Sequence, residues 1–322
     1  MLTDEPVEAP NTLLHKLQDL AAISKVISGP GTSLLSLDIN GRRHVTTDIG
    51  LGRVDRAVHV TTLVPGVNSQ PSRNLGDKVE EARDLLDVAA DLSAQAGEDV
   101  DATTHAAIVS MGYEAPQLDG RGLPEIVRGL QQTVTDDVAR DAGPGYADFL
   151  NSLDVTRAED PHLTVAGHSY GSLASSHALQ HGTGVDDFVA LGSPGTGVDD
   201  VAELKVPHGH VHNLEAKGDL VADSGWFGRD LSYLDGVRQL DTAGHDDLGL
   251  TEVRGHTSYY ASGSTSQHNV AAVASGHHEM AIDDTRAPDL TDEVRDDLRK
   301  AKGWVDDRLD DLRGSATWCE EG

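Results

Sequence analysis

The sequence is poor in cysteine, in aromatic residues and in long apolar runs. Cys319 is the one cysteine among 322 residues. A disulfide within the chain is therefore excluded, which is compatible with a reducing compartment. Aromatic residues make up 4% of the chain, so the core is expected to consist mainly of Val, Leu, Ile and Ala. No apolar run approaches the length of a membrane-spanning helix, and a membrane span is not expected.

Basic residues are also scarce. The chain has 25 Lys and Arg against 54 Asp and Glu, 39 of them Asp, which gives a net charge of −29. Such a surface repels nucleic acid and anionic membranes, and both are excluded as main partners. The composition is typical of salt-adapted or high-GC organisms, and equally of a merely soluble surface. Oligomeric state stays open.

The N-terminal stretch lacks the features of a secretory signal. Residues 1–10 contain three acidic residues and no apolar segment. This favours a cytoplasmic protein, with leaderless export left open.

The centre of the chain contains a nucleophile motif. Residues 163–166 are short and apolar or β-branched, as in a buried strand. Residues 167–171, Gly-His-Ser-Tyr-Gly, match G-x-S-x-G, and a helix rich in Ala and Leu is expected over 172–179. The motif makes a tight strand-to-helix turn that holds the serine in a strained geometry, so Ser169 is the candidate nucleophile. Gly167, His168 and Gly171 are its expected supports.

Strands that alternate with helices predict an α/β fold. The sheet should be mostly parallel, with an antiparallel N-terminal hairpin at its edge and helices on both faces. Asn40-Gly41 favours the hairpin turn. The expected strands are 33–39, 43–49, 59–64, 106–111, 163–166, 188–192 and 210–216, and the expected helices are 11–28 (capped by Asn11), 74–96, 146–153 and one beginning near 270.

One principal domain is expected, with a helical segment at each end. The boundaries are an N-terminal helical extension over 1–30, the α/β domain over 31–284, and an amphipathic helix within 285–322 packed on or beside it. Residues 220–255 have a loop-like composition. The polar stretch 117–141 is either a cap over a pocket or a surface connection.

A serine nucleophile needs a base and an acid, which should follow later strands at the carboxyl edge of the sheet. Asp219 directly follows the strand 210–216, with Asp223 as its rival. His256 in Gly-His-Thr-Ser-Tyr is a candidate base. Four other histidines also lie downstream of Asp219, and His245 is the strongest competitor among His245, His268, His277 and His278.

An oxyanion hole requires two fixed N–H donors. The residue after the nucleophile, Tyr170, supplies one. The turn Pro65-Gly66-Val67 follows an earlier strand, so the Val67 amide is the candidate for the other, unless that turn is purely structural.

The sequence gives little support for a metal site or a nucleotide-binding site. His277-His278-Glu279 and the segment 208–212 contain possible ligands, and His210 and His212 lie on one face of a strand. Neither segment matches a zinc spacing. No phosphate-binding glycine loop follows a strand. No metal and no cofactor is predicted.

Taken together, five motifs make the chain resemble a family. Val64-Pro65-Gly66, Gly112-Tyr113-Glu114-Ala115-Pro116, the serine motif, Gly218-Asp219 and the segment 255–259 are similar to the actinobacterial α/β-hydrolase family of unknown function once called DUF1023. The resemblance covers about residues 30–280. It implies an α/β-hydrolase fold with Ser169, Asp219 and His256 as the triad, and it is what places His256 above His245. Two positions depart from the pattern: Ser110-Met111 replaces a Trp-containing pair, and Leu220 replaces a Pro.

The sequence therefore predicts a serine hydrolase. It would cleave a small-molecule ester, or alternatively an amide or thioester, through an acyl-enzyme and without a cofactor. The alternative is a non-catalytic α/β-hydrolase-like domain that binds a ligand or docks a partner through its terminal helices.

Overall fold

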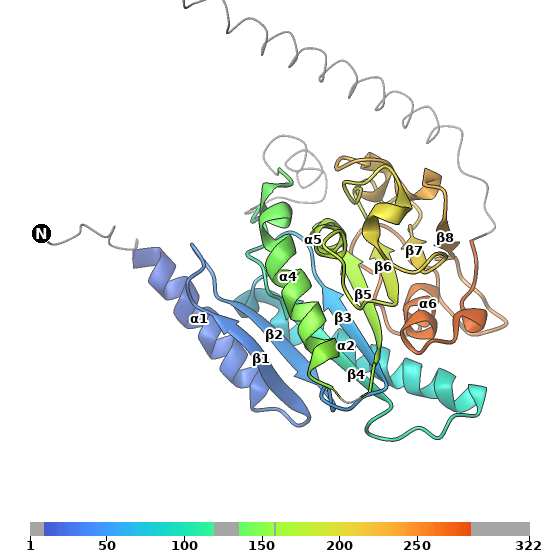
Figure 1. The fold of residues 1–322 in the computed structure, drawn as a ribbon, viewed down its shortest axis with the longest axis horizontal. Helices are drawn as coiled ribbons and strands as arrows, with labels where there is room; N and C mark the ends of the chain where they lie inside the picture. Colours follow the sequence, from blue (N-terminus) through green and yellow to red (C-terminus); the bar gives the residue numbers. More distant parts are fainter. Residues whose placement is uncertain (1–9, 119–134, 158, 285–322) are drawn as a thin grey trace, which may run out of the picture. The chain divides into compact units, whose positions relative to one another are not determined.

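The computed structural model describes residues 10–118, 135–157 and 159–284 (Figure 1). Their centre is an eight-stranded sheet with the order β1-β2-β4-β3-β5-β6-β7-β8. The strands are β1 (Thr32–Asp38), β2 (Thr46–Leu51), β3 (His59–Val64), β4 (His105–Met111), β5 (His162–His168), β6 (Asp187–Leu191), β7 (Val211–Leu214) and β8 (Val237–Leu240). β2 is antiparallel to both β1 and β4, and all other neighbours are parallel. The predicted fold class, with its antiparallel edge hairpin, is confirmed.

Helices cover both faces of the sheet (Figure 1). The helices are α1 (Pro10–Ile27), α2 (Pro71–Ala96), α4 (Asp137–Val155), α5 (Tyr170–Leu179) and α6 (Thr265–Ala274). α1, α2 and α6 share one apolar core with the sheet, and α4 and α5 share the other. The strands supply both cores because successive side chains point to opposite faces: Leu163 and Val165 enter the α4–α5 core, and Ala166 enters the other.

The edge hairpin has a longer connection than Asn40-Gly41 predicts. β2 begins at Thr46 and not at Arg43, so residues 39–45 form the connection. The cause is Glu114, whose carboxylate accepts the backbone N–H groups of Arg42, Arg43 and His44. These three amides are therefore not available to pair with β1, and the ladder starts later.

Two further elements differ from the expectation. α4 begins at Asp137, nine residues before the predicted start at 146, although Pro144 lies inside it. Its Gly143 faces α5 so closely that a Cβ there would lie 3.1 Å from the His177 carbonyl oxygen. Gly143, which argues against a helix in the sequence, thus allows a close packing of α4 on α5. β8 lies within the stretch 220–255, whose composition indicated a loop, and at four residues it is too short to show an alternating pattern.

α1 is less buried than its leucine spacing suggests. It begins at Pro10, so Asn11 lies within its first turn and does not precede the helix as a cap. Leu13 and Leu17 are more than half exposed, whereas Ile23 is buried and Asp19 is fully buried. The buried face of α1 thus includes the Asp19 carboxylate, which accepts hydrogen bonds from the backbone of Val45 and Ser72.

α1 and the sheet belong to one compact unit that ends at Asp284. The predicted C-terminal helix of 285–322 and most of the candidate cap 117–141 lie outside the described residues. In the part of the chain that the structure describes, no helix is both long and apolar enough to cross a membrane.

Candidate active site

Ser169 occupies the tight turn between β5 and α5. Its backbone has φ 57° and ψ −131°, and a positive φ is rare for residues other than glycine. The Ser169 amide donates a 2.9 Å hydrogen bond to the Leu191 carbonyl of β6, which holds the turn. The serine is only 2% exposed. This strained strand-to-helix turn is the geometry of a nucleophile elbow.

The two glycines of the motif are required by close backbone contacts. A Cβ at Gly167 would lie 2.7 Å from the Cα of Ser172, and one at Gly171 would collide with the carbonyl oxygen of Val64. Only glycine lets β3, β5 and the start of α5 approach this closely. The sequence motif therefore specifies the turn sterically.

The structure brings His256 and Asp219 to this serine. The Nε2 atom of His256 lies 2.8 Å from the Ser169 Oγ, and its Nδ1 atom lies 2.9 and 3.0 Å from the two oxygens of Asp219. Asp219 follows β7, and His256 lies in the loop between β8 and α6, so both come from the carboxyl edge of the sheet. Asp219 is fully buried and His256 nearly so. With a proton on Nδ1, the imidazole can accept the serine proton at Nε2.

The rival residues have other partners. The Asp223 carboxyl hydrogen-bonds with the Glu215 carboxyl, whose pKa is raised by burial first and then by its acidic neighbours. The other four candidate histidines contact groups away from Ser169. His245 contacts Asp241, His268 contacts the Met280 carbonyl, His277 contacts Ser93, and His278 contacts Asp187.

Tyr259 and Gly192 complete the surroundings of Asp219, and neither role was predicted from the sequence. The Tyr259 hydroxyl donates a 2.6 Å hydrogen bond to Asp219. A Cβ at Gly192 would lie 2.6 Å from the same carboxylate oxygen. Burial raises the pKa of Asp219, but hydrogen bonds from His256, Tyr259 and the backbone outweigh it and leave the pKa below its usual value. Asp219 is thus ionised. The position of Tyr259, three residues after His256, was the available signal.

His168 holds the backbone of His256. Its Nε2 atom lies 2.7 Å from the His256 carbonyl oxygen, an arrangement in which Nε2–H donates. Burial, and then the neighbouring His256, lower the pKa of His168 to about 3. His168 therefore stays neutral and fixes the backbone of His256.

This depressed pKa predicts acid destabilisation. The unfolded chain binds a proton at His168 below pH 6.5, whereas the folded chain does so only near pH 3. Stability contributed by the neutral form is complete above pH 6.5 and is lost as the pH falls. Between pH 7 and pH 5 His168 should reduce the free energy of unfolding by about 2 kcal/mol. Urea denaturation at the two pH values measures this. His168→Gln should remove that part of the pH dependence, and the exposed His208→Gln should not. An unchanged pH dependence in His168→Gln would contradict the assignment.

The loop after β3 lies against the serine. A Cβ at Gly66 would be 2.6 Å from the Ser169 Cβ and 3.0 Å from its Oγ, so the loop passes directly beside the hydroxyl. Val67 is the next residue of this loop, and Tyr170 is the first residue of α5. Within the described residues, neither of their amides donates to a backbone carbonyl. Both amides belong to the two segments that meet at Ser169.

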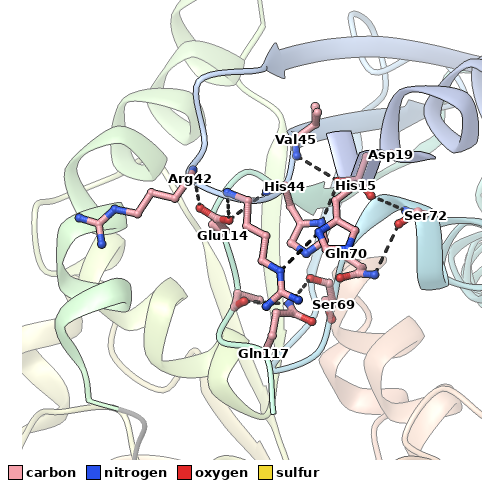
Figure 2. Close-up of polar contacts among 12 residues, drawn as sticks. His15, Asp19, Arg42, His44, Val45, Ser69, Gln70, Ser72, Glu114 and Gln117 are labelled. Atoms are coloured by element: carbon pink, nitrogen blue, oxygen red, sulfur yellow. Dashed lines mark hydrogen bonds and ion pairs between the residues drawn. The ribbon is translucent and has the colours of Figure 1, made fainter. Parts of the chain in front are cut away.

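Segment 113–118 fixes this loop. The Tyr113 hydroxyl donates to the Pro65 carbonyl at 2.6 Å, and the Asn68 amide donates to the Pro116 carbonyl at 2.9 Å. The side chain of Gln117 donates to the Ser69 carbonyl (Figure 2). The Gly-Tyr-Glu-Ala-Pro motif is therefore a brace for the loop that carries Val67.

The carboxylates of Glu114 and Asp19 extend the brace to the N-terminal elements (Figure 2). Glu114 holds the connection between β1 and β2 through its three backbone amides. Asp19 on α1 accepts from the Val45 amide and contacts His44 with one oxygen, and accepts from the Ser72 amide at the start of α2 with the other. α1 thereby links the edge hairpin to the helix that follows the Val67 loop.

Gly66→Ala should impair this site selectively. Because the new methyl group would overlap the Ser169 side chain and the His168 carbonyl, it must displace either Ser169 or the loop. We expect turnover to fall by about a hundredfold or more, as when one oxyanion donor is lost. Steady-state kinetics measure this, and Gly76→Ala on α2, where a Cβ meets nothing within 4 Å, is the control. Equal activity of the two variants would show that the loop does not approach the reacting atoms.

Comparison with known proteins places this chain in a family. A family model described as alpha/beta hydrolase matches residues 40–228, which is more than half of the chain. The chain belongs to the α/β hydrolase family. Uncharacterized proteins of Mycobacterium tuberculosis and Mycobacterium bovis are 38% identical to this α/β hydrolase over 238 residues, covering 71% of it and 85% of each relative.

Solved structures similar to this α/β hydrolase include two kinds of hydrolase. An esterase from Pyrobaculum calidifontis has a TM-score of 0.43 at 13% identity, over 83% of this chain and 94% of the esterase. A dienelactone hydrolase from Anabaena variabilis has a TM-score of 0.42 at 15% identity, over 78% and 99% of the two chains.

The two departures from the family pattern lie outside the hydrogen-bonded chain of Ser169, His256 and Asp219. Ser110 is buried and its hydroxyl donates to Asp48 on β2, which satisfies that carboxylate inside the sheet. Leu220 follows Asp219 but its side chain is 58% exposed. Neither residue contacts the three side chains through a hydrogen bond.

Potential metal ligands lie elsewhere. Within the described ranges, one group of side chains is placed to hold a metal ion, and it consists of His162, Asp187 and His278 at the amino ends of the strands. Ser169 lies at the carboxyl ends. The hydrogen-bonded chain of Ser169, His256 and Asp219 therefore stands apart from these ligands.

Proposed function

We propose that this protein is a serine hydrolase that cleaves carboxylic esters through an acyl-enzyme. The observation that carries the proposal is the continuous hydrogen-bonded chain from the Ser169 hydroxyl through His256 to Asp219. A non-catalytic binding domain has no need for a base aligned on a hydroxyl in a strained turn. The family relationship supports a hydrolase.

In the first half of the reaction, the Ser169 oxygen attacks the carbonyl carbon of the ester. His256 takes the serine proton at Nε2, and the resulting imidazolium is stabilised by Asp219, which stays ionised. The amides of Val67 and Tyr170 donate to the oxyanion of the tetrahedral intermediate. His256 then gives its proton to the departing alcohol, which leaves Ser169 acylated.

In the second half, water replaces the alcohol. His256 accepts a proton from the water as its oxygen attacks the acyl carbon, and then returns the proton to the Ser169 oxygen as the acid leaves. Every proton is thus transferred through one nitrogen of His256. Tyr259 and His168 act on this step indirectly, because they hold Asp219 and the His256 backbone.

Pre-steady-state kinetics with p-nitrophenyl acetate test the proposal. An acyl-enzyme predicts a burst of about one p-nitrophenolate per chain before steady turnover. The matching thioester and anilide separate the substrate classes, and we expect the ester to be hydrolysed fastest. Folded protein that turns over none of the three substrates would favour the binding-domain alternative.

A further inference from the structure

A second cluster of ionisable residues lies at the opposite edge of the sheet from Ser169. β3, β4 and β5 begin with His59, His105 and His162, and β6 begins with Asp187. These strands are parallel and in register, with His59 opposite both His105 and His162, so their amino ends meet at one edge. Since β5 runs from His162 to the elbow, about 20 Å of strand separates this edge from the nucleophile.

Asp187 is the centre of the cluster. Its carboxylate is fully buried and is surrounded by four imidazoles. One oxygen lies 2.8 Å from the Nε2 of His162 and 3.0 Å from the Nε2 of His278. The other oxygen lies 3.0 Å from the Nδ1 of His210 and 2.8 Å from the Nε2 of His212. The two His-rich segments that match no zinc spacing in the sequence thus converge on one buried acid.

His162, His278 and the Asp187 oxygen between them have the geometry of a metal site. The ligand atoms of His162, Asp187 and His278 all lie within 4.8 Å of one another. Zinc binds imidazole nitrogen and carboxylate oxygen at about 2.0–2.2 Å, which separates tetrahedral ligand atoms by about 3.3–3.5 Å. The Asp187 oxygen lies 2.8 and 3.0 Å from the two nitrogens, so each oxygen–nitrogen distance needs to open by about 0.3 to 0.7 Å to admit the ion. Two imidazoles and a carboxylate are donors that a zinc-class metal prefers.

The other two histidines, His210 and His212, orient the Asp187 carboxylate. His212 is 1% exposed, and its Nδ1 has no hydrogen-bond partner among the described residues. His212 is therefore best satisfied as a neutral ring that donates Nε2–H to Asp187, since a second proton on Nδ1 would be buried without an acceptor. The Asp187 oxygen that faces His162 and His278 can then bind a ligand. Metal-binding carboxylates and histidines are held by such outer hydrogen bonds.

The other ring nitrogen of His162 also has a partner. Its Nδ1 lies 3.3 Å from the Nδ1 of His59. When His162 carries its proton on Nδ1 and donates it to His59, the Nε2 lone pair is free to bind a metal. This is the tautomer that a metal-bound histidine commonly adopts.

We propose that His162, Asp187 and His278 bind one divalent transition-metal ion of the zinc class. The ion joins β5 and β6 to the segment after α6, which Arg238 also holds through the carbonyl oxygen of His278. Water completes the tetrahedron, because the chain supplies three ligands. The ion fastens residues near 278 to the amino edge of the sheet, about 20 Å of strand from Ser169, and takes no part in ester cleavage.

The test is zinc binding to full-length protein without a polyhistidine tag. After the metal is removed by a chelator, Zn²⁺ is titrated against a chromophoric chelator, and the melting temperature is recorded with and without Zn²⁺. We expect one ion per chain with submicromolar affinity, and a higher melting temperature with the ion bound. Ester hydrolysis well below the melting temperature should not change on metal removal.

Two variants locate the ion. His278→Ala should weaken binding at least tenfold and abolish the thermal shift, whereas His208→Ala, an exposed histidine of the neighbouring segment, should bind as the wild type does. Should His278→Ala fail to fold, the visible spectrum of Co²⁺-loaded wild type decides instead, because tetrahedral nitrogen and oxygen coordination gives far stronger absorption than hydrated Co²⁺. Absence of zinc uptake, equal uptake by both variants, or a hydrated-Co²⁺ spectrum would overturn the proposal.

Discussion

Replacing Ser169 by alanine should lower kcat/KM for ester hydrolysis by about three to six orders of magnitude. The variant loses the attacking oxygen and the partner of His256, and in triad hydrolases loss of the serine costs about as much as loss of the whole triad. The substituted residue is smaller and the turn keeps its glycines, so the fold should be retained. Steady-state kinetics with p-nitrophenyl acetate, together with a thermal melt, measure both.

Ser175→Ala is the matched control for this prediction. Ser175 is a buried serine of α5, the helix that follows Ser169, and its hydroxyl donates to the Gly171 carbonyl at 2.8 Å. Its removal should change turnover by a few-fold at most. If folded Ser169→Ala kept more than a tenth of the wild-type rate, the hydroxyl of Ser169 would not be the nucleophile.

Asp219→Asn should reduce kcat by about three to four orders of magnitude. An asparagine at this position can turn its amide N–H toward Nδ1 of His256, which favours the imidazole tautomer that carries the proton on Nε2. That tautomer cannot accept the proton of Ser169. The change is nearly isosteric, and the one carboxamide oxygen still accepts either from Tyr259 or from the backbone amides of Val221 and Ala222. The larger loss should therefore appear in kcat, with a smaller decrease in the melting temperature.

Asp223, the alternative to Asp219 as the acid, provides the control for this prediction. Asp223→Asn alters the carboxyl group that meets Glu215, four residues from Asp219, and should leave kcat within a few-fold of the wild type. A larger loss in Asp223→Asn than in Asp219→Asn would reverse the assignment of the acid. Equal losses would indicate a general effect on the loop.

The elbow was predictable because its determinants are local. A buried strand, two glycines that no side chain could replace and a following helix lie within 17 residues, from Leu163 to Leu179. Asp219 was predictable to a lesser degree, because it directly follows a strand at the correct edge. The choice of His256 over His245 rested on the family resemblance, since both histidines lie in polar loops whose distance from Ser169 depends on tertiary structure.

The remaining features depend on contacts between distant segments. Glu114 lengthens the hairpin connection from 70 residues away, and nothing near Asn40 announces it. Pro144 and the glycines beside it argued against a helix in the sequence, but α4 continues through them and packs closely on α5 at Gly143. The convergence on Asp187 was hidden in the same way: His210 and His212 share a strand face, but His162 and His278 come from other parts of the chain.

The most direct test of the proposed activity is labelling with a fluorophosphonate, followed by intact-mass measurement and peptide mapping, at low and at molar salt. An activated serine predicts one adduct per wild-type chain, located on the peptide that contains Ser169, and none on Ser169→Ala. If self-repulsion of the −29 charge loosens the fold, labelling should be faster at molar salt. Folded wild-type protein that forms no adduct at either salt concentration, or an adduct on another residue, would contradict a hydrolase built on Ser169.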